Sequence, residues 1–310
     1  MLKEKVLRFN LYIGLFILIS SEGLLLLGVP FIKNWFYSFA WWSFILMIDS
    51  LNFRRNKKSP LFESKEIFLF TAFISVFVWL IFELFNLRLT IWTYHDLPPS
   101  LWERWLGYFI AYASVIPAIK EIALFIRTFF KGTEFFLFKI RVTAAFLKII
   151  FILGLLSIIL SLSWPRIFFP FIWLCFILIL EPLNYRLKNR TFLREVEEES
   201  WSNLLSWILA GLVAGILWEF WNFWATSHWQ YSLPYLNFWR VFQMPVFGYT
   251  GFLPFALEVF ALYQILFWAY KKLEGRILVK IIAFIFLLLF YGGCFYLIDT
   301  FTLVHSSLLY

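Results

Sequence analysis

The sequence predicts an all-α polytopic membrane protein, made of two parallel four-helix repeats and one further C-terminal transmembrane helix. Three observations lead to this prediction. The 310-residue chain is 62% hydrophobic and only 15% charged, with a mean hydropathy of +0.80, and a soluble domain could not cover so much apolar surface. Nine apolar stretches are long enough to cross a bilayer. Polar residues inside these stretches recur at a nearly constant spacing.

The nine stretches justify the helix count. We expect transmembrane helices at residues 11–31, 35–51, 66–90, 105–129, 144–163, 167–183, 203–226, 245–270 and 277–299. The first stretch is too long for the apolar core of a signal peptide and lacks a small-residue cleavage pattern, so we interpret it as a retained helix. The second, fifth and sixth are short enough to be tilted or partly interfacial.

Basic residues predict the orientation. Five clusters each follow an even number of predicted crossings and therefore share one face: Lys3/Lys5/Arg8, Arg54/Arg55/Lys57/Lys58, Lys131/Lys139/Arg141, Arg186/Lys188/Arg190/Arg194 and Lys271/Lys272/Arg276. The positive-inside rule then predicts a cytoplasmic N-terminus and an external C-terminus in the cell (inner) membrane. This topology accounts for the net charge of +8, so we expect no nucleic-acid partner.

The polar residues of the apolar stretches occur in two sets. Glu83/Asn86, Trp92/Tyr94 and Pro117/Glu121 recur 136 or 137 positions later as Glu219/Asn222, Trp229/Tyr231 and Pro254/Glu258. Asp49/Asn52/Arg54 recur 132 positions later as Glu181/Asn184/Arg186. We therefore divide the chain into a first repeat at 1–140, a second at 141–273 and a final helix within 274–310. An even number of helices per repeat gives both repeats the same orientation, with a pseudo-twofold axis along the membrane normal.

The duplicated acids are the candidate site. A carboxyl group inside a membrane is costly unless it has a partner or a task, and a proline within a helix often marks a cavity or packed protein. We expect the four acids to converge on one cavity, where burial keeps at least one of them protonated as a general acid beside an anion. The expected catalytic set is Glu83, Glu121, Glu219, Glu258, Asn86 and Asn222.

Aromatic residues of the same segments are expected to line the substrate path, because their ring faces stabilise a transient cation. They are Trp92, Tyr94, Trp218, Trp229 and Tyr231. A simpler interpretation of the Glu/Asn pairs is hydrogen bonding between helices. We interpret Asp49, Asn52, Arg54, Glu181, Asn184 and Arg186 as structural, with each acid pairing with arginine and capping the chain at a helix end.

Metal and cofactor sites are not expected. His95, His228 and His305 have no metal-ligand spacing. Cys175 and Cys294 both lie in apolar stretches, without a CxxC motif. The glycines form no phosphate-binding loop.

The order of the duplicated residues resembles the small integral-membrane lycopene cyclase domain, in its fused tandem form. Trp218-Glu219-Phe-Trp-Asn222, Trp229-Gln-Tyr231 and Pro254-Phe-Ala-Leu-Glu258 carry this resemblance, with their counterparts in the first half. The family has Pro-x-Glu-Glu where both halves here have Pro-x-x-x-Glu, and three helices per unit where we expect four. The resemblance implies an enzyme of carotenoid biosynthesis.

Three functions remain open from the sequence. The leading one is an enzyme that acts on a long apolar, polyisoprenoid-like membrane lipid by protonation and carbocation chemistry, giving cyclisation, isomerisation or hydration. The second is a proton-coupled transporter, for which parallel repeats and paired acids also suffice. The third is a non-catalytic membrane subunit of a larger, quinone-associated complex.

Overall fold

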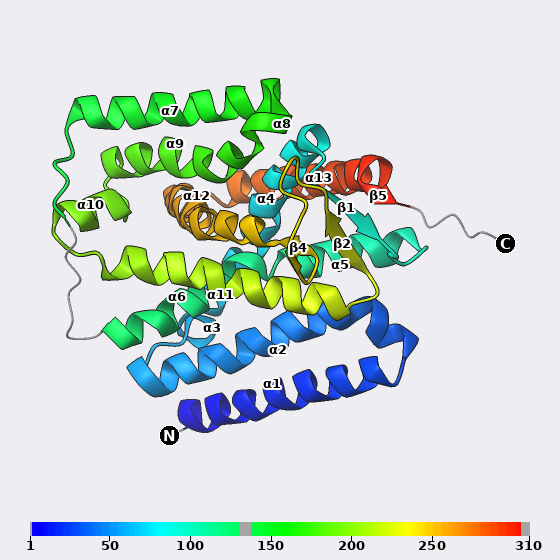
Figure 1. The fold of residues 1–310 in the computed structure, drawn as a ribbon. Helices are drawn as coiled ribbons and strands as arrows, with labels where there is room; N and C mark the ends of the chain where they lie inside the picture. Colours follow the sequence, from blue (N-terminus) through cyan, green and yellow to red (C-terminus); the bar gives the residue numbers. More distant parts are fainter. Residues whose placement is uncertain (1, 131–137, 305–310) are drawn as a thin grey trace.

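The computed structural model describes residues 2–130 and 138–304, and the side chains of residues 9–61, 64–130 and 138–304 within them (Figure 1). Lys131 and His305 lie outside the described residues, and so do the side chains of Lys3, Lys5 and Arg8. The helices are α1 (Leu2–Leu26), α2 (Pro30–Asn56), α3 (Pro60–Glu63), α4 (Lys65–Leu89), α5 (Leu101–Tyr112), α6 (Val115–Arg127), α7 (Ala144–Ser163), α8 (Pro165–Phe168), α9 (Ile172–Arg186), α10 (Phe192–Glu197), α11 (Ser202–Trp224), α12 (Phe252–Lys272) and α13 (Ile277–Phe301).

Eight helical spans in the described part of the chain are long and apolar enough to cross a membrane, so the chain is an integral membrane protein. They are Phe9–Leu26, Lys65–Leu89, Leu101–Phe130, Ala144–Ser163, Pro165–Arg186, Ser202–Trp224, Val246–Lys272 and Ile277–Phe301. The expected crossing at 35–51 corresponds to α2, which packs along α1 but is not among the eight. Asp49, Arg54 and Arg55 fall within this helix. The ninth crossing therefore stays a prediction.

The predicted helix at 105–129 is divided into α5 and α6, and a serine of α4 explains where. Ser75 donates a 2.6 Å hydrogen bond to the carbonyl of Tyr112 and accepts a 2.9 Å bond from the backbone N–H of Ile116. The Ser75 hydroxyl thus bridges the carbonyl of Tyr112 and the N–H of Ile116, which would bond to each other directly in a continuous helix. Pro117, which has no N–H, follows at once and further weakens the helix here.

Short strands, which were not predicted, form in the loops of this mostly helical chain. The strands are β1 (Trp92–His95), β2 (His228–Tyr231), β3 (Arg240–Val241), β4 (Met244–Pro245) and β5 (Leu303–Val304). β1 pairs antiparallel with β2 and parallel with β5, and β3 pairs with β4. Alternating aromatic and polar residues in Trp-Thr-Tyr-His and His-Trp-Gln-Tyr suit strands.

The pairing of β1 with β2 relates the two Trp-x-Tyr motifs symmetrically. Trp92 lies opposite Tyr231, and Tyr94 lies opposite Trp229. Each tryptophan of one half therefore faces the tyrosine of the other. We call the side of the molecule with β1, β2 and β5 the sheet end, on the right in Figure 1, and the opposite side, with the turns after α2 and α9, the basic end.

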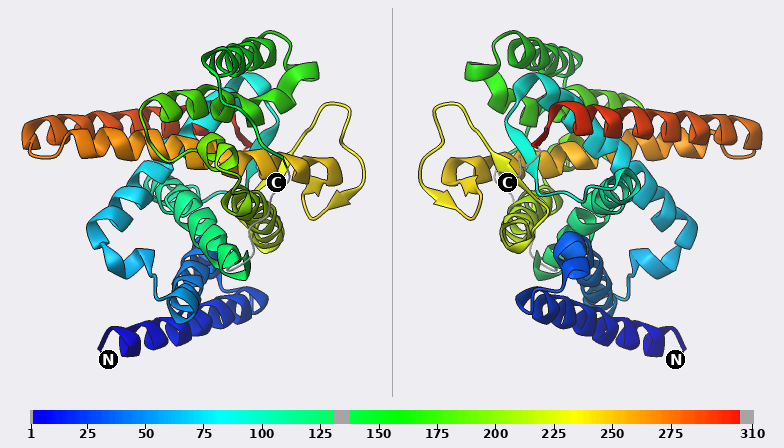
Figure 2. Two further views of the ribbon diagram at one scale, coloured as in Figure 1. Left: turned by 90° about the vertical axis from the view of Figure 1, so that its left-hand side faces the viewer. Right: turned by 90° about the vertical axis from the view of Figure 1, so that its right-hand side faces the viewer.

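Helices of the two halves also pack against one another: α2 of the first half contacts α11 of the second, and α9 of the second half contacts α4 of the first. The α1–α2 pair and the α7–α9 pair lie on opposite sides of α4, α6, α11 and α12 (Figures 1 and 2). α2 contacts α11 through three aromatic pairs, and two of these have counterparts at the matching positions between α9 and α4. These two pairs are Trp41–Trp218 (ring centroids 5.8 Å apart) and Phe44–Trp221 (5.8 Å), matched by Trp173–Phe82 (5.4 Å) and Phe176–Phe85 (5.9 Å).

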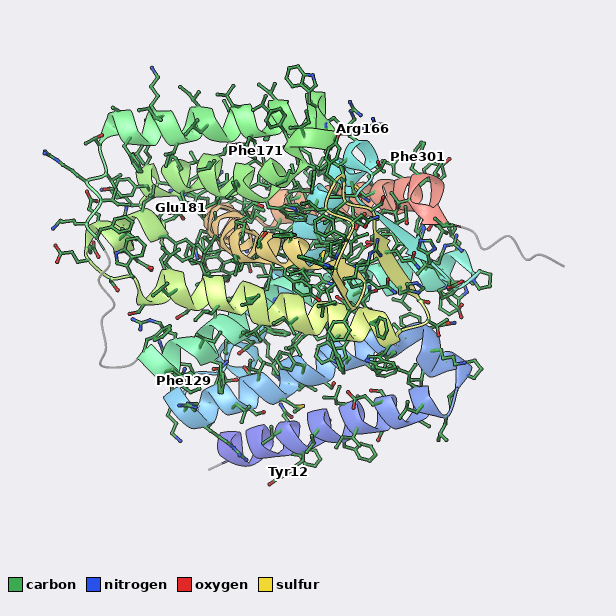
Figure 3. The ribbon with its side chains drawn as sticks, viewed as in Figure 1. Tyr12, Phe129, Arg166, Phe171, Glu181 and Phe301 are labelled. Atoms are coloured by element: carbon green, nitrogen blue, oxygen red, sulfur yellow. The ribbon has the colours of Figure 1, made fainter. Side chains whose placement is uncertain are left out.

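Apolar side chains cover both the interior and the rim of the bundle. Tyr12 and Phe301, labelled in Figure 3, lie on the outside of the helices and are 63% and 67% exposed. Glu181, labelled in the same view, is buried. Exposed apolar side chains together with buried acids are typical of a chain that faces lipid.

Candidate functional site

Glu83 is buried in α4 and receives hydrogen bonds from three side chains. The indole N–H of Trp79 donates to Oε1 at 2.8 Å, and that of Trp92 lies 3.2 Å from the same oxygen. The phenol of Tyr94 also donates to Oε1, and the hydroxyl of Tyr112 donates to Tyr94 at 3.0 Å. Hydrogen-bond donors around a buried carboxyl stabilise its charged form and so offset part of the cost of burying it.

Glu219 is equally buried in α11 but has fewer partners. The phenol of Tyr231 donates a 3.0 Å hydrogen bond to Oε1. Among the described residues, Oε2 has no hydrogen-bond partner. The indole of Trp229 lies near this carboxyl, but its N–H falls short of hydrogen-bond geometry. The two matched acids therefore have unequal environments.

A glycine explains this difference. The position that matches Trp79 is Gly215, which cannot donate a hydrogen bond from a side chain. The ring of Phe252 fills the space instead: a Cβ on Gly215 would lie only 2.2 Å from its Cδ2 atom. The second half thus replaces the donor with a packed aromatic ring.

Both strand tyrosines keep their protons and act as donors. Burial raises the pKa of Tyr94 and of Tyr231 well above its ordinary value of about 10, and the neighbouring glutamate raises each further. A phenol in such a place donates a hydrogen bond rather than ionising.

Asn86 and Asn222 each bind the backbone of the strand that follows them. Asn86 Oδ1 accepts from the N–H of Ile91 and of Trp92, and its amide donates to the carbonyl of Trp92 at 2.8 Å. Asn222 accepts from the N–H of Trp229 and donates to its carbonyl, both at 2.9 Å. These amides hold the strands against the ends of α4 and α11.

The other two acids, Glu121 and Glu258, have different hydrogen-bond partners from Glu83 and Glu219. Glu121 Oε2 accepts a 2.7 Å bond from Asn52, and its own backbone carbonyl accepts from the same amide. Glu258 Oε1 accepts a 2.7 Å bond from the backbone N–H of Phe176 in α9. Glu121 and Glu258 are thus bound by groups other than the strand tyrosines that bind Glu83 and Glu219.

Asp49, near the end of α2, and Glu181, near the end of α9, each bind the start of the short helix that follows. Asp49 Oδ1 accepts from the N–H of Leu61 at 3.1 Å, and Glu181 Oε2 accepts from that of Leu193 at 2.9 Å. Both amides belong to the short helices α3 and α10, so each acid caps the following helix. Among the described side chains, neither Arg54 nor Arg186 forms an ion pair with these acids.

Asn184 is also used structurally, because its amide donates to the carbonyl of Ala261 at 2.9 Å. Asn52 makes the corresponding bond to the carbonyl of Glu121. Ala261 lies three residues beyond Glu258, so the contact between α9 and α12 is shifted by almost one turn. This shift separates Glu258 from Asn184, whereas Glu121 stays bonded to Asn52.

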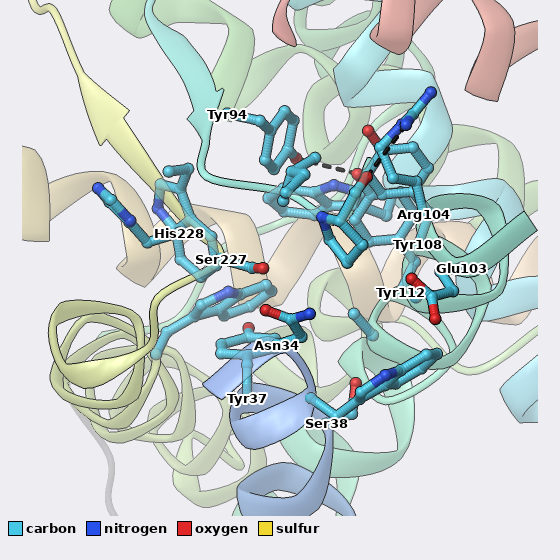
Figure 4. Close-up of a pocket in the computed structure, with 18 residues that line it drawn as sticks. Asn34, Tyr37, Ser38, Tyr94, Glu103, Arg104, Tyr108, Tyr112, Ser227 and His228 are labelled. Atoms are coloured by element: carbon cyan, nitrogen blue, oxygen red, sulfur yellow. Dashed lines mark hydrogen bonds between the residues drawn. The ribbon is translucent and has the colours of Figure 1, made fainter. Parts of the chain in front are cut away.

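Two cavities lie against the paired strands and share a wall of Trp79, Tyr94 and Trp229. The larger has a volume of about 370 Å³, and Trp92, Tyr231, Trp173 and Phe255 also line it. The smaller, of about 90 Å³, is lined by Trp218 and by the residues labelled in Figure 4: Asn34, Tyr37, Ser38, Tyr94, Glu103, Arg104, Tyr108, Tyr112, Ser227 and His228. All five aromatic residues expected to line a substrate path therefore line one of these cavities.

The carboxyl groups of Glu83 and Glu219 do not reach the two cavities directly. Neither Glu83 nor Glu219 is among the residues that line the two cavities. Tyr94 and Tyr231 are, and each donates to one of the acids. The phenols thus connect the carboxyl groups with the cavity space.

Sequence reasoning missed two residues of this region. Trp79 lies one turn before Glu83 on the same helix face, and that spacing was a usable signal. Asp299 of α13 accepts from Arg104 at 3.0 and 3.1 Å, from Trp105 at 3.1 Å and from Tyr108 at 2.8 Å. An acid inside the last apolar stretch was itself a signal, although it belongs to neither repeat.

Within residues 2–130 and 138–304 no group of three metal-binding side chains occurs. His95 and His228 are cross-strand neighbours with stacked rings 5.7 Å apart. Comparisons with protein families, curated proteins and solved structures find no match to this chain.

Proposed function

We propose that this protein is an integral-membrane enzyme that acts on a long apolar lipid of the polyisoprenoid type by protonation and carbocation chemistry. One observation carries the proposal. Two matched intramembrane acids are each hydrogen-bonded to a strand tyrosine that lines an aromatic cavity. Such acids are expensive in a membrane and are generally functional.

The unequal environments assign the roles. Glu219, with one donor and an unpartnered oxygen, is suited to hold a proton. Glu83, with three side-chain donors, is suited to remain an anion. A neutral acid and a carboxylate in one site is the usual arrangement for acid catalysis with charge stabilisation.

The proposed reaction needs only Glu219, Tyr231 and the substrate for its proton transfers. The hydroxyl of Tyr231 turns from Glu219 to the substrate, gives its proton to one carbon of a substrate double bond and takes the proton of Glu219 in return, which leaves a cation on the other carbon. A neighbouring double bond attacks that carbon and forms a ring bond, and loss of a proton from the ring restores the acid. Trp79, Trp92 and Trp229 present ring faces that stabilise the cation.

We also propose that the chain consists of two parallel repeats. The symmetric pairing of the Trp-x-Tyr strands and the matching aromatic contacts of α2 with α11 and of α9 with α4 support two parallel repeats. The order of acid, Trp-x-Tyr and proline-acid also resembles the tandem lycopene cyclase domain. That resemblance suggests a carotenoid-like substrate, with Asn86 and Asn222 as positioning residues and Glu121 and Glu258 as supporting acids.

The test is extraction of pigments and lipids from lycopene-accumulating cells that express the chain. We expect a new apolar product with the natural sequence, and its loss with Glu219→Gln at equal protein level. Glu181→Gln is the matched control, because its acid is buried in the same half but binds the backbone N–H of Leu193 at the start of α10. Equal product from both variants would exclude Glu219 as the acid.

A further inference from the structure

A third cavity, at the basic end, has a different chemical character from the aromatic pair. Its volume is about 380 Å³. It lies where the starts of α3 and α4, the middle of α6, the end of α12 and the turn after α9 meet. Its lining is Lys58, Pro60, Ser64, Ile67, Phe68, Thr71, Pro117, Lys120, Glu121, Leu124, Arg190, Tyr263 and Phe267. We call this space the basic cavity.

Three cations from three separate segments line the basic cavity. Lys58 comes from the turn after α2, Lys120 from α6 and Arg190 from the turn after α9. Arg190 is 3.6 Å from Glu195, and its side chain is 70% exposed, so solvent weakens that pair. Glu121 is the one acid among the described side chains of the lining. The positive charges therefore exceed the negative ones, and the space attracts an anion.

The position of Lys120 is fixed by an aromatic partner rather than by an acid. Its ammonium group donates a 3.2 Å hydrogen bond to the hydroxyl of Tyr263 and lies 4.7 Å from the centre of that ring. The accepting hydroxyl keeps its own proton to donate elsewhere. Lys120 and Tyr263 thus present two adjacent donors from α6 and α12.

Two further features of the lining suit a phosphate. Ser64 caps the N-terminus of the 25-residue helix α4, where free N–H groups and the helix dipole favour an anion. Glu121 is 1% exposed, and its Oε1 has no hydrogen-bond partner within the described residues. In its protonated form this carboxyl would donate a hydrogen bond to a phosphate oxygen.

Apolar residues share the lining with these polar groups. Ile67, Phe68, Leu124 and Phe267 complete the wall, and the helices that bear them belong to membrane-spanning segments. A space with cations and a helix start among apolar side chains accommodates a ligand with an anionic head and a hydrocarbon tail.

We propose that the basic cavity binds a phosphate monoester or diphosphate group, carried by a membrane lipid or present as the free anion. Lys58, Lys120 and Arg190 supply the charge, and Tyr263 supplies a hydroxyl donor. This site lies at the end opposite Glu83 and Glu219. It does not depend on the proposed enzymatic function.

The test measures binding of three probes to the purified full-length chain in detergent: dioctanoyl phosphatidic acid, dioctanoyl phosphatidylcholine and inorganic phosphate. We expect phosphatidic acid to bind at least tenfold more tightly than phosphatidylcholine. Binding of inorganic phosphate with equal affinity would identify the free anion as the ligand, and much weaker binding would identify the lipid.

Substitutions of the cations that line the basic cavity test whether the phosphate probe binds there. Lys120→Gln with Arg190→Gln should weaken binding of the phosphate probe at least tenfold, whereas Lys120→Arg retains it. The matched control, Lys272→Gln with Arg276→Gln, removes two exposed cations near the end of α12, outside the cavity lining, and should leave binding unchanged. Variants are compared only where size-exclusion chromatography gives a single folded species. Equal weakening by both pairs, or no preference over phosphatidylcholine, would overturn the proposal.

Discussion

The indole of Trp79 donates a 2.8 Å hydrogen bond to Glu83, one turn further along α4. No such donor exists for Glu219, because the position that matches Trp79 is glycine. The two halves thus keep the acid and the strand tyrosine but differ in the third partner. Duplicated sequence with unequal surroundings is a simple way to give two identical groups different protonation states.

Removing the indole donor should destabilise the protein. Trp79→Phe keeps an aromatic ring but leaves Glu83 with one hydrogen bond fewer, and hydrogen bonds to charged groups contribute about 1.5–3 kcal/mol. Thermal unfolding in detergent should show a lower Tm. Trp102→Phe, at an exposed tryptophan of α5, is the control and should leave Tm unchanged. An unchanged Tm for Trp79→Phe would mean that the bond contributes little.

The two asparagines should differ in their contribution to stability. Asn86→Leu removes three hydrogen bonds to the start of β1, and Asn222→Leu removes two to β2. Each backbone group left unpaired costs about 1–3 kcal/mol. We expect both variants to unfold at lower temperature, with the larger drop for Asn86→Leu. The reverse order in a thermal scan would contradict this description of the strand anchors.

Asp299 and Arg104 should behave as a coupled pair. Their side chains are each only 11% exposed, and loss of one partner from a buried pair costs about 3–5 kcal/mol. Asp299→Leu should therefore destabilise strongly, since Arg104 then keeps an uncompensated charge. The double variant Arg104→Met/Asp299→Leu should regain part of that loss. Additive losses in a double-mutant cycle would show that the pair is not coupled.

Acid should loosen the pairing of β1 with β2. Burial lowers the pKa of His95 from its ordinary value, and the neighbouring His228 lowers it further. The folded protein then binds fewer protons than the unfolded chain, so stability is complete above pH about 6.5 and declines below it. Amide hydrogen exchange in β1 should be faster at pH 5.5 than at pH 7.5, after correction for intrinsic rates. His95→Gln should lose this pH dependence, and equal protection of the natural chain at both pH values would contradict it.

Much of the helical architecture could be predicted from composition, because a transmembrane helix needs only an apolar stretch of sufficient length. The stretch at 35–51 is the exception, since α2 carries Asp49 and two arginines near its end. The division between α5 and α6 could not be predicted, because the hydroxyl that replaces the helical bond comes from Ser75 in another helix.

The sequence pattern relates each acid to the tyrosine that binds it, but it does not give the arrangement of the four acids in space. The duplication identified Glu83 and Glu219 and the tyrosines that bind them. It also suggested that Glu121 and Glu258 converge with them, which equal spacing along the sequence cannot establish. The positions of those two acids depend on how α6 and α12 pack against α2 and α9. A shift of almost one turn between matching helix contacts leaves no trace in a sequence repeat.

Transfer of a solvent-derived proton to the substrate is the central claim, and deuterium incorporation tests it most directly. The purified protein in nanodiscs would be incubated with lycopene in D₂O, and the apolar products analysed by mass spectrometry. We predict a cyclised or isomerised product that carries one added deuterium, formed by the natural chain and lost in Glu219→Gln, with Tyr231→Phe strongly reduced. A product without deuterium, or no conversion of lycopene by the folded natural chain, would contradict the account.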